Sequence, residues 1–167
     1  RICQGGDVMM AVVCPTRGRP GGFAKMCRSV QETSSAVVLP YMDEDDASEY
    51  VNVPIIVGPR IGRGAAINHL CEVFPEFDLY TLGSDDAVFI QQGWDEIVAE
   101  AMPKDGIGVV NLARETAEDF VNWPCVSRKW IDAIGWMHPP RLDHYCQDTS
   151  MQALSDDLGS TLYLPNN

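Results

Sequence analysis

The chain has 167 residues, the length of a single domain, and carries 24 acidic against 12 basic residues, for a formal charge of −12. A strongly acidic chain repels phosphate backbones and anionic lipids, so a broad surface that binds nucleic acid or membrane is excluded. An anionic ligand must therefore bind at a local group of positive charges. The composition, 46% apolar and 22% charged, is typical of globular proteins and excludes disorder. The apolar runs, such as residues 8–13, are shorter than the roughly 20 residues that cross a bilayer.

The first half of the chain alternates strand and helix patterns. Residues 8–14 form a compact apolar run that predicts a buried strand, and it leads into a basic, glycine-rich loop over residues 15–22. Four apolar residues then recur at helical spacing on one stripe, namely Phe23, Met26, Cys27 and Val30. Two further strands are predicted over residues 36–42, which end in the acidic run 43–46, and over residues 53–57.

The second half continues the alternation. A helix is expected to open at Gly62-Arg63-Gly64 and to end at Pro75, and residues 78–82 predict a strand that runs into Gly83-Ser84-Asp85-Asp86. A helix over residues 94–101 and a strand over 107–112 follow. Ser127 is a predicted N-cap of a short helix that ends at Gly135. A last helix over 147–158 and an edge strand over 161–164 complete the order.

This alternation of apolar strands with helices predicts an α/β domain whose sheet is covered on both faces. No repeat or linker divides the chain, so residues 8–167 are expected to form one domain, with residues 1–7 left unassigned.

The six cysteines form no C-x-x-C pair, which favours free, buried thiols in a reducing compartment over a disulfide framework or a zinc site. A cytoplasmic location is the corresponding expectation. The positions are Cys3, Cys14, Cys27, Cys71, Cys125 and Cys146.

Polar residues gather where the predicted strands end. Acids and arginines follow the strands, and because parallel strands end at the same edge of a sheet, they are expected to converge there. The arginines, which would offer donors matched to phosphate, are Arg17, Arg19, Arg60 and Arg63. Asp85 and Asp86 are adjacent carboxylates, and like charges this close together repel one another unless a cation neutralises them. Oxygen ligands of this kind suit Mn²⁺ or Mg²⁺, whose shell water and substrate phosphates complete.

Residues from about 8 to 158 resemble a small GT-A-type glycosyltransferase, most similar to the inverting family 2 enzymes. The likeness rests on five motifs in order: residues 12–20 (Val-Val-Cys-Pro-Thr-Arg-Gly-Arg-Pro), the acidic end of the second strand, residues 62–68, Leu82-Gly83-Ser84-Asp85-Asp86 as a D-x-D-like motif, and Val126-Ser127-Arg128-Lys129 followed by Tyr145-Cys146-Gln147-Asp148. The resemblance implies a three-layer sandwich around a mostly parallel sheet. Gly83 stands in the place of the first aspartate of a full D-x-D.

The resemblance also assigns roles to individual residues. Pro15, Thr16 and Arg17 would contact the nucleotide, and Asp43 or Asp45 would hydrogen-bond its base or ribose.

The remaining roles concern the phosphates, the sugar and the chemistry. Arg63 would lie near the donor base or phosphates, and Asp85 would contact the ribose or sugar. Asp86 would bind the Mn²⁺ or Mg²⁺ ion, with His144 as a further metal ligand. Asp148 would be the general base, with Asp143 as a nearby competitor.

The function implied is metal-dependent transfer of a sugar, with inversion, from a nucleoside diphosphate sugar to a hydroxyl of a glycan, protein or small molecule. The acceptor site could belong to a partner or to a second subunit of a homo-oligomer. Two alternatives stay open. A nucleotidyltransferase acting on a sugar phosphate would use the glycine-rich loop with Gly18, Gly21 and Gly22, and a non-catalytic binding or assembly module would keep the fold without turnover.

Several side chains have two interpretations. Asn68 could orient a loop or face solvent, and His138, beside two prolines, is expected to be an exposed spacer. His69 is expected to be structural. Among the aromatic residues, Trp94 and Trp130 fit helical stripes of the core, whereas Trp123 and Trp136 could pack or could reach an acceptor.

Overall fold

The computed structural model describes residues 8–50, 56–112, 123–140, 142 and 147–163, with side chains at all of these except 46, 47, 49, 147, 148 and 163. A seven-stranded sheet forms its centre, in the order β3-β2-β1-β4-β6-β5-β7. Only β6, among the described strands, runs antiparallel to its neighbours, so the predicted, mostly parallel α/β architecture is confirmed. The strands are β1 (Met10–Thr16), β2 (Val37–Asp43), β3 (Ile56–Gly58), β4 (Leu79–Leu82), β5 (Val109–Asn111), β6 (Pro124–Ser127) and β7 (Thr161–Tyr163).

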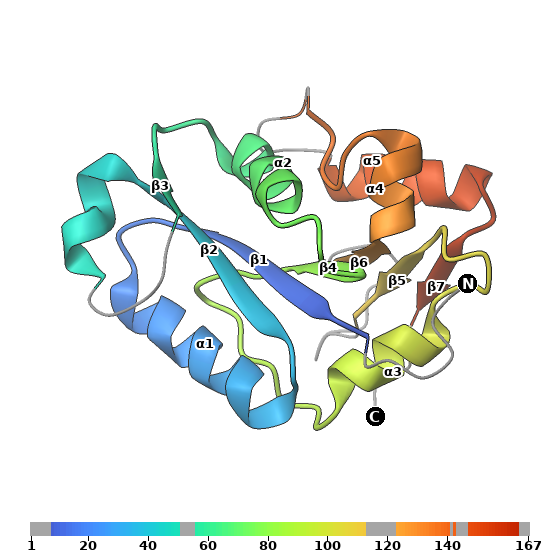
Figure 1. The fold of residues 1–167 in the computed structure, drawn as a ribbon, viewed down its shortest axis with the longest axis horizontal. Helices are drawn as coiled ribbons and strands as arrows, with labels where there is room; N and C mark the ends of the chain where they lie inside the picture. Colours follow the sequence, from blue (N-terminus) through green and yellow to red (C-terminus); the bar gives the residue numbers. More distant parts are fainter. Residues whose placement is uncertain (1–7, 51–55, 113–122, 141, 143–146, 164–167) are drawn as a thin grey trace.

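Helices cover both faces of this sheet, which gives three layers (Figure 1). One face carries α1 (Pro20–Thr33) and α3 (Trp94–Ala101), and the other carries α2 (Arg63–Val73), α4 (Arg128–Ile134) and α5 (Gln147–Asp157). The acidic run after β2 forms a short 3₁₀ helix, η1 (Glu44–Glu49).

The alternation of side chains along β1 explains why both faces are apolar. Ala11 and Val13 join the cluster that includes Trp130, whereas Val12 and Cys14 join the cluster that includes Trp94. Since successive side chains of a strand point to opposite faces, a fully apolar strand must be covered twice. The prediction that Trp94 and Trp130 belong to the core is confirmed, since they are 4% and 0% exposed.

The register of the parallel strands positions the site. Thr16, the last residue of β1, lies beside Met42, and Val13 lies beside Leu82, the last residue of β4. The carboxyl ends of β1, β2 and β4 therefore meet at one edge of the sheet, as predicted.

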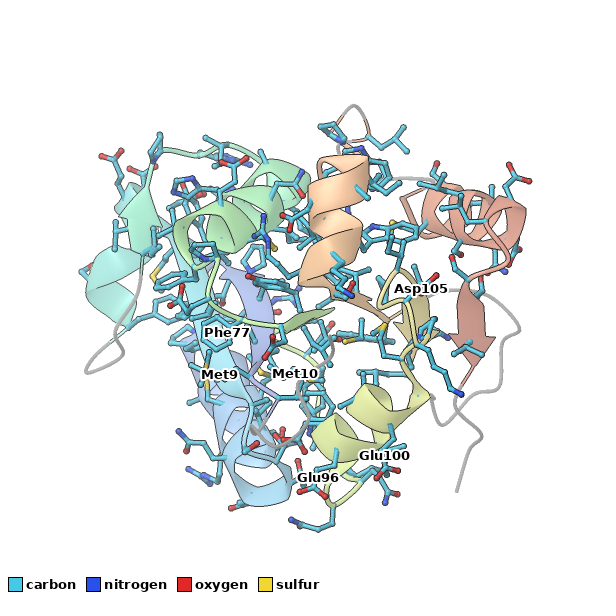
Figure 2. The ribbon with its side chains drawn as sticks, turned by 45° about the vertical axis from the view of Figure 1, so that its right-hand side comes forward. Met9, Met10, Phe77, Glu96, Glu100 and Asp105 are labelled. Atoms are coloured by element: carbon cyan, nitrogen blue, oxygen red, sulfur yellow. The ribbon has the colours of Figure 1, made fainter. Side chains whose placement is uncertain are left out.

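At the opposite end of the sheet, two hydrogen bonds join the residues that precede β1 and β4. The Asp78 N–H donates to the Met9 carbonyl at 2.9 Å, and the Met9 N–H donates to Asp78 Oδ2 at 3.0 Å. Figure 2 labels Met9 and the neighbouring Phe77 at this end. These contacts hold β1 and β4 side by side and so support the loops at the other end.

Local signals explain the helix ends. The Ser127 hydroxyl accepts a hydrogen bond from the Trp130 N–H at 3.0 Å, and Gly135 has φ +91°, a conformation that favours glycine, so both predicted caps are confirmed. Strand β6 is a difference: residues 124–127 were not expected to form a strand. Their run is short and begins with proline, and pairing on both sides with β4 and β5 makes it a strand.

Other predictions are confirmed in part. Of the predicted strand over residues 53–57, residues 53–55 lie outside the described ranges, and residues 56–57 belong to β3. All four cysteines that lie in the described ranges are free; Cys14, Cys71 and Cys125 are buried and Cys27 is half-buried. Cys3 and Cys146 lie outside the described residues. Among the described residues, no helix combines the length and the apolar character needed to traverse a bilayer.

Candidate functional site

A cleft of about 340 Å³ opens where β1, β2 and β3 end. Its volume lies at the lower end of the range typical of small-molecule sites. Five residues predicted from the sequence as nucleotide contacts line it together: Pro15, Thr16, Arg17, Asp43 and Arg63. Four further residues line it: Tyr41, Arg60, Gly62 and Ala66. Of these, Arg60 is one of the arginines expected at this edge as phosphate donors, and the other three had no predicted contact.

The charged residues of the cleft make it locally positive within an acidic chain. Among the described lining residues, Arg17, Arg60 and Arg63 stand against one carboxylate, that of Asp43. Arg17 Nε lies 3.5 Å from Asp43 Oδ2, and the side chains are 49% and 15% exposed, so the carboxylate is the more enclosed partner. Guanidinium groups match the geometry of phosphate oxygens, so these arginines form a local cluster of positive charge that can bind an anionic ligand.

Tyr41 contributes a neutral hydroxyl to the wall. Its Oη donates to the Pro59 carbonyl at 2.7 Å, which holds the segment that follows β3 against β2. Burial, reinforced by the nearby charges of Asp43 and Glu44, raises the pKa of Tyr41 above its ordinary value. The phenol therefore stays protonated and keeps this bond at all ordinary pH values.

The N-terminus of α2 faces the same cleft. Gly62 precedes the helix with φ +79°, which a side chain would strain, and Arg63 is the first helical residue. The first turn of a helix leaves backbone N–H groups without helical partners, and these favour anions.

Asn68 fastens this helix to the loop after α4. Its amide Nδ2 donates to the His138 carbonyl at 2.8 Å, and its Oδ1 accepts from the N–H groups of Met137 and His138 at 3.1 and 2.9 Å. Of the two interpretations of Asn68, the structure thus favours the one in which it orients a loop. His138 was wrongly expected to be exposed: it is 4% exposed and packs where a Cβ on Gly64 would meet its Nδ1 at 2.7 Å.

Histidine 69, expected to be structural, packs edge to face on Tyr41 with ring centroids 5.9 Å apart. It lies on the same helix, α2, and supports the tyrosine that lines the cleft.

Asp85 is held against the end of β1. Thr16 Oγ1 donates to Asp85 Oδ2 at 3.2 Å, and Arg19 Nη1 lies 3.2 Å from Asp85 Oδ1. Arg19 Nη1 also lies 3.8 Å from Asp86 Oδ2, so this guanidinium neutralises part of the charge of both carboxylates. From the sequence, a divalent cation was expected to neutralise these carboxylates, and Arg19 was expected only as a phosphate donor; the structure pairs Arg19 with both aspartates.

Asp86 differs from Asp85 in its exposure. Its side chain is 70% exposed, against 12% for Asp85, and one of its oxygens accepts a hydrogen bond from the Ser84 hydroxyl. Neither aspartate lines the cleft itself; Asp85 reaches it through Thr16, which does. In the part of the chain that the structure describes, no group of three or more His, Cys, Asp or Glu residues could hold a metal ion.

Two glycines allow the close approach of β1, α1 and β4. A Cβ on Gly22, in the first turn of α1, would overlap the main-chain carbonyl oxygen of Asp85. A Cβ on Gly83 would meet side-chain carbons of both Val12 and Cys14 at 2.9 Å. Burial, and secondarily the Asp85 charge, raises the pKa of the Cys14 thiol far above its ordinary value, so it is a neutral packing group.

The remaining predicted residues are less well placed or lie outside the description. Asp45 is exposed on η1 and does not line the cleft, so of the two alternatives Asp43 is the one at the site. His144 and Asp143 lie outside the described residues. Asp148 belongs to the first turn of α5, but its side chain is outside the description. Trp123 and Trp136 are half-buried and pack against the core.

Comparison with known proteins shows similarity at the level of structure alone. No family model and no curated protein sequence matches the chain. A mannosyltransferase from Pyrobaculum calidifontis, PcManGT, in complex with GDP-Man and Mn²⁺, superposes with a TM-score of 0.71 at 10% identity over 94% of this chain and 55% of its own. S. aureus TarS (1-349) in complex with UDP gives 0.70 at 12% identity over 96% of this chain and 59% of its own.

A third similar structure is of a different enzyme class. A putative glucose-1-phosphate thymidylyltransferase from Bacillus anthracis gives a TM-score of 0.60 at 9% identity over 96% of this chain and 87% of its own. The chain spans only a little over half the length of the PcManGT and TarS chains. At these identities the similarity shows architecture, and the expected resemblance is confirmed at that level: the chain has the GT-A fold.

Proposed function

We propose that this chain is a glycosyltransferase domain, formed by residues 8–167, that transfers a sugar from a nucleoside diphosphate sugar to a hydroxyl acceptor. The observation that carries the proposal is the positive cleft at the carboxyl ends of β1, β2 and β3, with Asp85 and Asp86 beside it. Structures of similar fold have been determined with GDP-Man and Mn²⁺ and with UDP, so nucleoside diphosphates are the first class of ligand to test.

The cleft residues would divide the donor between them. Asp43, the enclosed carboxylate, would accept hydrogen bonds from the base or ribose, while Arg17 stays paired with it. Arg63 and the first turn of α2 would bind diphosphate oxygens. Asp85, already fixed by Thr16 and Arg19, would contact the ribose or the sugar.

The donor set beside the cleft fits a divalent cation bound through a single carboxylate. Asp86 presents an exposed carboxylate, and Mg²⁺ and Mn²⁺ accept one or two carboxylates completed by water and phosphate oxygens. When bound, the ion would supply Lewis-acid stabilisation of the diphosphate leaving group. Asp86, with His144 as an additional candidate, is the residue we assign to hold it.

The chemical step requires a base on the side of the sugar opposite the diphosphate. We assign this role to Asp148, at the start of α5, which would take the proton from the acceptor hydroxyl as the new bond forms and invert the anomeric configuration. The diphosphate leaves as an anion that the guanidinium groups of the cleft stabilise. The acceptor could be a glycan, a protein or a small molecule, and a second subunit could complete its site.

Titration calorimetry with UDP and GDP, each with and without MnCl₂, tests the proposal. We expect one nucleotide to bind, more tightly with Mn²⁺, and Arg63→Ala to weaken binding roughly tenfold or more, because a charge-assisted hydrogen bond to phosphate is lost. Arg28→Ala, which removes the same charge from an exposed position on α1, is the control and should bind as the wild type does. Absence of binding by both nucleotides would contradict the proposal.

Turnover assays separate the alternatives. Slow Mn²⁺-dependent hydrolysis of GDP-Man or UDP-Gal, lost in Asp86→Asn, supports glycosyl transfer and excludes a non-catalytic module. Release of pyrophosphate from a nucleoside triphosphate and a sugar phosphate would instead indicate a nucleotidyltransferase. The structure gives that alternative little support from its glycine-rich loop, because Gly21 and Gly22 belong to α1 and Gly22 packs on Asp85.

A further inference from the structure

A directed chain of hydrogen bonds ends at the Asp85 carboxylate. The Arg19 N–H donates to Tyr50 Oη at 3.0 Å, Tyr50 Oη and Thr16 Oγ1 are 2.9 Å apart, and Thr16 Oγ1 donates to Asp85 Oδ2 at 3.2 Å. A hydroxyl has one hydrogen, and that of Thr16 is directed to Asp85. Tyr50 must therefore be the donor in the central bond, and all three bonds point from a backbone amide toward the carboxylate.

Packing fixes the middle of this chain. Tyr50 is 8% exposed and Thr16 is 5% exposed, and the Tyr50 ring lies edge to face against Phe23 of α1, with ring centroids 5.8 Å apart. Tyr50 directly follows η1, so the series of hydrogen bonds joins the segment after β2 to the ends of β1 and β4. Bonds aligned in one direction polarise one another in a poorly solvated interior, which strengthens the last bond to Asp85.

Both oxygens of Asp85 are thereby engaged. Oδ2 accepts from Thr16 and Oδ1 faces Arg19, while the absent side chain of Gly22 lets the Asp85 carbonyl pack against α1. The carboxylate has one orientation that satisfies both donors. Removing the hydroxyl of Tyr50 would leave Thr16 without its donor and free to rotate away from Asp85.

We infer that Tyr50 is a positioning residue, which acts through Thr16 to orient the Asp85 carboxylate for the donor. The inference rests on the proposed function, in which Asp85 contacts the ribose or sugar. Tyr50 does not line the cleft, so its effect on a ligand must travel through Thr16. No local sequence pattern indicates this role, since 34 residues separate Tyr50 from Thr16.

Binding of GDP-Man and UDP-Gal with MnCl₂, measured by calorimetry, tests the inference. We expect Tyr50→Phe to weaken binding of whichever donor binds by about tenfold, the effect of losing one net hydrogen bond. The double variant with Asp85→Asn should bind no more weakly than Asp85→Asn alone. The control is Tyr80→Phe, which removes another buried tyrosine's hydroxyl bond, to the Phe74 carbonyl at 2.6 Å, and should bind as the wild type does.

The inference would be overturned if Tyr50→Phe binds the donor as tightly as the wild type does. It would also be overturned if the losses of affinity caused by Tyr50→Phe and by Asp85→Asn multiply in the double variant. If Tyr50→Phe does not fold, the pair Thr16→Ser and Thr16→Val tests the same chain from its centre. Serine keeps the hydroxyl and should retain most of the affinity, whereas valine should lose about tenfold. Equal affinity of the two variants would overturn the inference as well.

A measurement without ligand separates this inference from the proposed function. Urea unfolding of Tyr50→Phe, Thr16→Val and the double variant forms a double-mutant cycle. If the wild type binds neither donor, the proposed function fails, and the cycle still decides on the hydrogen-bond chain. Losses of stability that are not additive support it, and additive losses overturn it.

Discussion

Gly21→Ala and Gly22→Ala, adjacent substitutions in the first turn of α1, should change stability in opposite directions. A Cβ on Gly21 meets no atom within 4 Å, whereas a Cβ on Gly22 would stand well inside 3.0 Å of the Asp85 main-chain oxygen. Alanine gains up to about 1 kcal/mol over glycine in a helix, and this gain applies to both positions. The pair therefore isolates the contact between α1 and the loop that carries Asp85.

The magnitude follows from the two contributions. Gly21→Ala should stabilise the protein by up to about 1 kcal/mol. At Gly22 the same gain is outweighed, because overpacking against a main-chain atom costs typically 1–3 kcal/mol, so a net loss of about 1–2 kcal/mol is expected. For a chain of this size the two variants should differ in Tm by roughly 5–10 °C.

Thermal and urea unfolding followed by tryptophan fluorescence measure this difference, and the chain has 4 tryptophans to report it. Because the Asp85 carbonyl must move, Gly22→Ala should also weaken binding of GDP or UDP, while Gly21→Ala should leave it unchanged. Equal stabilisation by both substitutions would refute the close approach of α1 to Asp85.

Three further predictions concern stability. Asn68→Ala should lower the free energy of unfolding, measured with urea, by about 2–3 kcal/mol, because three hydrogen bonds to the loop after α4 are lost. The control Glu72→Ala, at an exposed position of the same helix, should lower it little, and equal losses would contradict this account. Ser127→Ala should lower the unfolding free energy by about 1–2 kcal/mol through loss of the helix cap, and an unchanged midpoint would argue against the cap. Hydrogen bonds from Gln152 and Thr161 lower the pKa of Asp156 below 3.8, so its stabilising contribution is present above that pH and lost as the pH falls through the lowered pKa. In Thr161→Val, NMR titration of the Asp156 carboxyl should show a higher pKa, and an unchanged value would contradict this assignment.

Much of the fold and part of the site follow from local sequence patterns. The strand ends can be predicted because apolar runs stop at charged or glycine-rich residues, and parallel strands bring those residues to one edge. For this reason Arg17, Asp43 and Arg63 could be grouped from the sequence, and the structure places all three around one cleft. The helix caps at Ser127 and Gly135 could also be predicted from the sequence, since each depends on a few neighbouring residues.

The contacts that fix the geometry of the site depend on residues far apart in the chain. The contact of Asn68 with His138 spans 70 residues of the chain, and that of Arg19 with Asp85 spans 66. No local spacing in the sequence therefore predicts either contact. The burial of His138 has the same origin, because it depends on the space that Gly64 leaves open. Strand β6 was missed because its pairing partners, rather than its own composition, make it a strand.

The close packing of Gly83 on β1 sets a barrier to changing the acidic motif. An aspartate at position 83, which would complete the D-x-D pattern, needs space that the side chains of Val12 and Cys14 fill. A single substitution would therefore first cause a steric clash between the end of β4 and the side chains of β1. Engineering a second acid at this strand end requires smaller residues on β1 beforehand, so the order in which substitutions are introduced matters as much as their identity.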